Sequence, residues 1–163
     1  MAFRLVSSAG SVTDAAMVNM PASGTIYPGG VVAFERGTNL SNGYVYPATS
    51  STTQTQIFGI AYDYREGVSD VNVTVLPFCP GQLWEADCIN VVTTAQIGKK
   101  FQFATGTTRE RNTYILNTSY DQSGMTGIFM CWQITSTTTG SGKIIGEFIR
   151  NNASVGLNST TFN

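Results

Sequence analysis

Short runs of β-branched and aromatic residues, separated by turn-forming residues, constrain the fold of this chain most strongly. Residues 71–75 (VNVTV) and 101–103 (FQF) alternate, which places the apolar side chains of each run on one face of a strand. Four more runs have a strand composition: Val31–Phe34, Ile57–Tyr64, Ile128–Ile134 and Ile144–Ile149. Turn signals such as residues 28–30 (PGG), 41–43 (SNG) and 140–142 (GSG) stand between them. The spacing predicts an all-β fold, a small barrel or sandwich.

A parallel sheet of βαβ units would need helical stretches of roughly ten or more residues between its strands. The single helix candidate is Val12–Val18, which begins with Thr13 and Asp14 as a capping pair. Asn19 and Pro21 end this helix within about two turns. We therefore predict a chain made almost entirely of strands and turns.

The first 25 residues differ in composition from the rest. Phe3, Leu5 and Val6 are apolar, but the following Ser-Ser-Ala-Gly-Ser stretch cannot form a core alone. Two interpretations remain open: an arm that docks on another protein, or an ordinary first strand. The expected organisation is an N-terminal arm at residues 1–25, a β-domain at 26–150 and a polar C-terminal tail at 151–163.

The chain has 163 residues, of which 42% are hydrophobic, enough for one core. Only 12% are charged, about half the usual share, so the surface must be mostly neutral. We expect part of it to lie against other protein, although a Thr-rich sheet face in water would have the same composition.

The net charge of −1 gives no attraction for a phosphate backbone, so we expect no nucleic-acid partner. No run of about 18 apolar residues predicts a membrane span. Residues 1–10 lack the apolar stretch of a secretion signal, and we expect the protein to be made and kept in a cytoplasm.

The three cysteines, Cys79, Cys88 and Cys131, are odd in number, lack CxxC spacing and stand beside apolar residues. This pattern favours buried free thiols. A disulfide between Cys79 and Cys88 is an alternative if their strands pair.

The chain contains no histidine, which excludes Ser-His and Cys-His nucleophiles and the commonest zinc sites. Its ten acidic residues are scattered. Asp63 and Glu66 flank a turn, and Glu85 and Asp87 alternate on one strand, so we interpret them as solvated turn and edge positions rather than a glycosidase pair. We predict that the protein is not an enzyme and holds no metal or cofactor.

Trp84 and Trp132 lie in apolar runs, and we expect both in the core. Tyr27, Tyr44 and Tyr46 stand beside turns, which makes them better candidates for a surface that stacks on a sugar ring.

Six segments occur in an order that resembles the capsid decoration, or cement, proteins of tailed bacteriophages. They are SGTIYPGGVVAF (23–34), GYVYPAT (43–49), QIFGIA (56–61), VTVLP (73–77), PGQLWEA (80–86) and AQIGKK (95–100). In that family a glycine turn leads into a Val-Val-Ala strand, and a Gly-Ile-Ala strand follows a short hairpin. The resemblance covers roughly residues 20–150.

The resemblance implies a β-barrel or β-tulip domain with an extended N-terminal arm, bound to the outer surface of the phage head. Its implied partners are the major capsid protein and further copies of itself in a homotrimer, and its location is the virion. The alternative is a head-fibre or tail-associated module that binds a host glycan. Candidate contacts with the capsid or between subunits are Phe3, Arg4, Leu5, Val6, Tyr27, Tyr44 and Tyr46.

Overall fold

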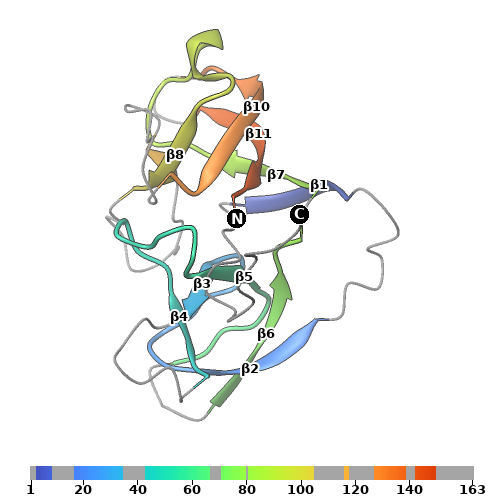
Figure 1. Cartoon of the computed structure of the whole chain (residues 1–163), viewed down its shortest axis with the longest axis vertical. Helices are drawn as coiled ribbons and strands as arrows, with labels where there is room; N and C mark the ends of the chain where they lie inside the picture. Colours follow the sequence, from blue (N-terminus) through green and yellow to red (C-terminus); the bar gives the residue numbers. More distant parts are fainter. Residues whose placement is uncertain are drawn as a thin grey trace, which may run out of the picture.

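The computed structural model contains two β-sheets, one of them closed into a barrel (Figure 1). It describes residues 3–8, 17–34, 43–66, 71–79, 81–104, 116–117, 127–138 and 142–149. Within these ranges the only helical element is the 3-10 turn η2 (Thr94–Gln96). The all-β prediction is confirmed.

The barrel has the strand order β2-β4-β3-β5-β6. Its strands are β2 (Val18–Ala22), β3 (Val31–Phe34), β4 (Val45–Pro47), β5 (Ile57–Ala61) and β6 (Val71–Pro77). Strand β2 closes it, because β2 pairs antiparallel with β6 and parallel with β4 through Ala22 and Val45. Closure leaves these five strands without an open edge.

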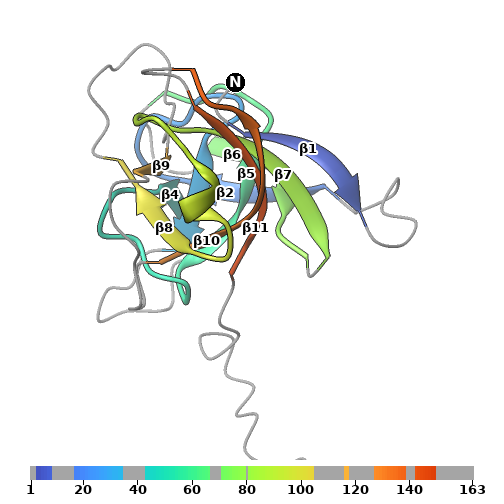
Figure 2. The same ribbon diagram turned by 90° about the horizontal axis from the view of Figure 1, so that it is seen from above.

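The second sheet has six strands in the order β1-β7-β11-β10-β8-β9, and every neighbouring pair is antiparallel. Its strands are β1 (Phe3–Ser8), β7 (Gln82–Asp87), β8 (Lys100–Phe103), β9 (Leu116–Asn117), β10 (Phe129–Ser136) and β11 (Lys143–Phe148). Figure 1 shows it beyond one end of the barrel, and Figure 2 looks down onto it.

Two clusters of buried side chains hold the sheets together. The first lies between the six-stranded sheet and the barrel wall, and the second fills the barrel. Strand β3 contributes to both, since Val31 and Ala33 belong to the first cluster and Val32 to the second. A strand buried on both faces has no polar alternation, which explains the continuous Val-Val-Ala run.

For residues 3–8 the structure shows an ordinary first strand, the second of the two interpretations, and not an arm that docks on another protein. Residues 3–8 form β1, which pairs with β7 from Phe3↔Ala86 to Ser8↔Gln82. Phe3 is 1% exposed and contacts the rings of Phe103, Phe129 and Phe148. The partner strand lies far along the chain, so no local pattern could reveal the pairing. Because β1 and β2 belong to the two sheets, the β-domain begins before residue 26; the predicted tail at 151–163 lies outside the described residues.

The predicted helix at 12–18 is also corrected at its end, where Val18 begins β2; residues 12–16 lie outside the described ranges. Cys88 and Cys131 are buried as predicted, but Cys79 is exposed. All three are free thiols, so Cys79 and Cys88 form no disulfide.

Candidate binding surfaces

One face of the six-stranded sheet packs on the core, and the other points away from it; we call the second the outer sheet face. Burial alternates along β7, where Trp84 and Ala86 are buried and Glu85 and Asp87 are partly exposed between them. The strand register then assigns the positions opposite Glu85 and Asp87 on neighbouring strands to the same face. The outer sheet face comprises Arg4, Leu83, Glu85, Asp87, Lys100, Gln102, Met130, Trp132, Gln133, Lys143, Ile145 and Glu147.

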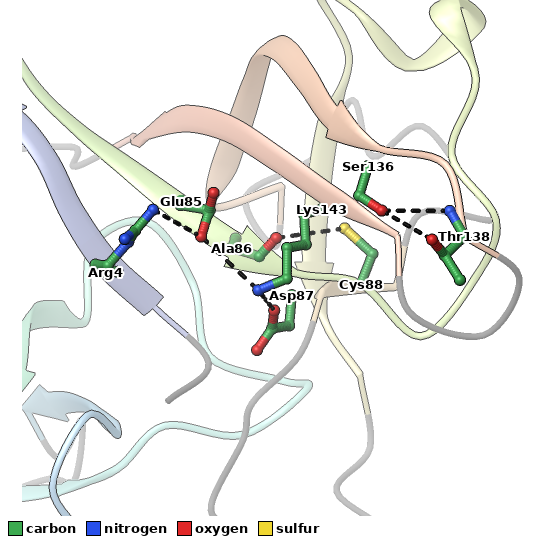
Figure 3. Close-up of polar contacts among 8 residues, drawn as sticks. All are labelled: Arg4, Glu85, Ala86, Asp87, Cys88, Ser136, Thr138 and Lys143. Atoms are coloured by element: carbon green, nitrogen blue, oxygen red, sulfur yellow. Dashed lines mark hydrogen bonds and ion pairs between the residues drawn. The ribbon is translucent and has the colours of Figure 1, made fainter.

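Four charged residues of this face form a line of ion pairs across three strands (Figure 3). Arg4 Nη2 lies 3.2 Å from Glu85 Oε1, and Lys143 Nζ lies 3.8 Å from the same oxygen and 3.1 Å from Asp87 Oδ1. The hydrogen bond to Asp87, together with the charge of that carboxylate, raises the pKa of Lys143. Exposed ion pairs each stabilise a fold by at most about 1 kcal/mol. Their main effect here is that the charges of these four residues neutralise one another.

The strand pairing corrects the interpretation of Glu85 as an edge position, because Glu85 lies opposite Arg4 on β1 and Ile145 on β11. Strand β7 lies between β1 and β11, and the side chain of Glu85 is only 16% exposed. The predicted alternation along this strand is confirmed, but β7 is an interior strand only because β1 pairs with it.

Trp132 is the most exposed large hydrophobic side chain among the described residues of the outer sheet face, at 49%, and the expectation that it lies in the core is wrong. Cys131 pairs with Gly146 and Gln133 pairs with Ile145, so Trp132 is an extra residue without a partner on β11. Such a bulge redirects side chains locally. Residues 128–132 are apolar at every position, so the sequence could not show which face of β10 lies outward.

A second bulge exposes Val6 on β1. Leu5 pairs with Trp84 and Ser7 with Leu83, which leaves Val6 unpaired and 45% exposed. Among the four predicted N-terminal contact residues, Phe3 belongs to the core and Leu5 packs against it, whereas Arg4 and Val6 are exposed. Only Arg4 and Val6 are therefore accessible to another molecule.

A separate aromatic surface is formed by Tyr27 and Tyr64, whose ring centroids lie 5.1 Å apart at an interplanar angle of 62°. Ile26 and Arg65 place the two rings together through reciprocal backbone hydrogen bonds of 2.8 and 2.7 Å. Tyr64 is 45% exposed, and sequence reasoning missed it because it lay at the end of a run assigned as a strand. Desolvation, together with the charge of Glu66 and the neighbouring Tyr27, raises the pKa of Tyr64.

The two other predicted tyrosines lie at and just before β4. Tyr44 is half-buried just before β4, and Tyr46 is half-buried within β4, opposite Ala33. The ring contact of Tyr27 is with Tyr64, a residue that was not among the predicted contact residues.

The two cysteines in the core are poor nucleophiles. Burial raises the pKa of Cys88 to about 12 and that of Cys131 to about 11, so both thiols are protonated at neutral pH.

No three potential metal ligands gather within the part of the chain that the structure describes. In the same ranges, no helix has the length and hydropathy to cross a bilayer.

The Tyr27–Tyr64 pair and the outer sheet face lie at different ends of the molecule. Arg65 Nε donates to the carbonyl oxygen of Asn72 near the beginning of β6, whereas Leu76 near its end packs in the cluster beneath the six-stranded sheet. Figure 1 shows β6 running from the far end of the barrel towards β1.

Comparison of the chain with known proteins found no matching family model, curated protein or solved structure.

Proposed function

We propose that this protein is a structural component of a phage virion that binds the outer surface of the head and stabilises the capsid lattice by bridging coat subunits. The exposed Trp132 on the outer sheet face is the observation that carries the proposal. Large exposed aromatic side chains are enriched at protein interfaces, where they act as binding hot spots. The resemblance of segments such as 23–34 and 56–61 to capsid decoration proteins indicates which interface this would be.

The exposed half of an indole corresponds to roughly 100 Å² of apolar surface, and its burial would contribute about 3 kcal/mol to binding. Trp132 projects from β10, an interior strand between β11 and β8. A partner docked on these strands would therefore cover the sheet surface around the indole. Full exclusion of water around an anchor residue is the condition under which a hot spot contributes most.

The four residues of the outer sheet face that form ion pairs also suit a neutral partner surface. Arg4, Glu85 and Lys143 are already paired within the chain, so docking against uncharged groups leaves none of them without a counter-charge. Arg4 and Val6 stand at the β1 edge of the same sheet and extend the contact area. We propose the major capsid protein as the partner and a homotrimer as the bound state.

A cement protein needs no chemistry, because it acts by binding the assembled lattice and not its separated subunits. Rupture of the lattice must then release the bound copies first, which raises the free energy needed to open the shell. Many copies that each contribute a few kcal/mol would produce a large stabilisation, provided that each buries on the order of 1,000 Å².

The test is binding of the purified full chain to expanded empty heads of its phage, measured by co-sedimentation and by the melting temperature of the heads. We expect saturable binding and a higher melting temperature. The variant Trp132→Ala should bind at least about tenfold more weakly, since it loses most of the indole contact. Tyr62→Ala, which removes an equally exposed aromatic ring from the barrel, is the matched control and should bind normally.

Two results would overturn the proposal. Wild-type protein that neither sediments with the heads nor raises their melting temperature would refute the function. Normal head binding by Trp132→Ala would refute the outer sheet face as the contact surface.

A further inference from the structure

The segment 62–66, which leaves β5, alternates aromatic and charged residues as Tyr-Asp-Tyr-Arg-Glu. Tyr62 is 46% exposed and Tyr64 45%, in a chain where only 12% of residues are charged. The antiparallel bridge between Ile26 and Arg65 places Tyr27 opposite Tyr64, and the two rings pack together. Exposed aromatic rings and charged groups therefore meet here on one short stretch of chain.

This segment is held firmly by the barrel. Tyr62 N donates to Thr74 O at 2.8 Å, and Thr74 N donates to Asp63 Oδ2 at 3.1 Å. Arg65 donates through Nη1 to the carbonyl oxygen of Tyr64 at 2.8 Å and through Nε to that of Asn72. A surface held in place before binding loses little conformational entropy when a ligand arrives.

The charges restrict which ligands fit. Arg65 lies 3.7 Å from Asp63 and uses its guanidinium on backbone carbonyls, so its charge is largely occupied within the chain. Glu66 adds a further carboxylate, and its charge contributes to the raised pKa of Tyr64. The local potential is therefore negative, which disfavours phosphate, sulfate and carboxylate ligands. Carboxylates instead accept hydrogen bonds from neutral hydroxyl groups.

We propose that the Tyr27–Tyr64 pair, with the exposed Glu66 two residues after Tyr64, is a binding site for a neutral hexopyranose of a glycan. The apolar C–H face of a pyranose ring packs on the exposed face of Tyr64, and its hydroxyl groups donate to Glu66. The site goes beyond the capsid role proposed above and does not depend on it. It uses the barrel end remote from the six-stranded sheet, so a copy attached through its outer sheet face would keep this site open to solvent.

A surface site of this size, with two rings and one carboxylate, binds a single sugar with a dissociation constant of about 1 mM. Many copies displayed on one particle would raise the effective affinity by several orders of magnitude through multivalency. The weak intrinsic affinity therefore requires a measurement sensitive at millimolar concentration.

The experiment is saturation-transfer NMR on the full-length protein with methyl glycosides of glucose, galactose and mannose, followed by an array of neutral and sialylated oligosaccharides. We expect binding of at least one neutral glycoside. Tyr64→Ala should weaken it at least about tenfold, Tyr64→Phe should retain most of it because the ring face remains, and Glu66→Gln should weaken it severalfold. Trp132→Ala is the matched control and should bind the sugar normally.

The proposal is overturned if wild-type protein binds no neutral glycoside when the glycoside concentration is about ten times the expected dissociation constant. Binding confined to sialylated glycans would contradict the charge argument, and unchanged binding by Tyr64→Ala would contradict the location. Head binding distinguishes the two proposals, since Tyr64→Ala should leave it intact and Trp132→Ala should weaken it.

Discussion

Phe3 stands edge-on to Phe103, with ring centroids 6.0 Å apart and an interplanar angle of 84°, although the two residues come from β1 and β8, near opposite edges of the six-stranded sheet. Phe129 and Phe148 complete the ring cluster around Phe3. The curvature of the sheet brings these strands over a common core, visible in Figure 2. The N-terminal strand is therefore part of the core that it covers.

Substitution of Phe3 distinguishes a core strand from a dispensable arm. Phe3→Ala should lower the free energy of unfolding by about 3–5 kcal/mol, because it removes a fully buried ring and leaves a cavity. Val6→Ala, at the exposed bulge of the same strand, should cost less than about 1 kcal/mol. Urea denaturation followed by circular dichroism measures both, and equal small effects would mean that β1 contributes little to the fold.

The buried thiols predict a loss of stability at alkaline pH. Burial raises the pKa of Cys88 from 9.0 to about 12 and that of Cys131 to about 11. Between pH 9 and these values the folded chain keeps protons that the unfolded chain has released, so stability is full below pH 9 and falls as pH rises. Each thiol contributes at most about 1.4 kcal/mol per pH unit within its window.

Denaturant titrations at several pH values from 8 to 11 give this slope for the wild type. The double variant Cys88→Ala/Cys131→Ala should show a shallower slope, whereas Cys79→Ser, which alters an exposed thiol, should keep the wild-type slope. A slope that is identical in the double variant would show that these thiols do not titrate differently on folding.

Gly146 on β11 lies against β10 with no room for a side chain. A Cβ at this position would overlap the carbonyl oxygen of Met130 and lie 2.5 Å from Phe129 Cε1. Gly146→Ala should therefore destabilise the fold by about 3 kcal/mol, because neither neighbour can move without disturbing β10.

Gly98 provides the matched control for Gly146. A Cβ there would meet no atom within 4 Å, and only its positive φ of +80° disfavours other residues. Gly98→Ala should cost about 1–2 kcal/mol. Thermal denaturation compares the two variants, and a larger loss for Gly98→Ala would contradict the packing seen at Gly146.

The local sequence predicted the strands well where alternation is complete. Val31–Phe34 coincides with β3, and Phe101 and Phe103 share the buried face of β8 as predicted. Of the three valines predicted on one buried face in 71–75, Val73 and Val75 are buried but Val71 is 40% exposed, because it is the first residue of β6. The burial of a residue at the end of a strand depends on the neighbouring segments more than the burial of a residue at its centre does.

The candidate surfaces were predicted less completely. Tyr27, Arg4 and Val6 were identified from sequence and are accessible or partly accessible, whereas Phe3 and Leu5 belong to or pack on the core. Trp132 and Tyr64, which carry the two proposals, were missed. A bulge displays the first, and a bridge between residues 26 and 65 pairs the second with Tyr27.

The amino-acid sequence by itself determined the all-β character, the positions of the main strands and the neutrality of the surface, because alternation, turn chemistry and charge are properties of neighbouring residues or of composition. Only the tertiary structure decided that β1 completes the six-stranded sheet, that Trp132 faces outward and that Tyr27 meets Tyr64. These features require contacts between residues distant in the chain, and such contacts form when the sheets close around their shared core rather than from any local preference.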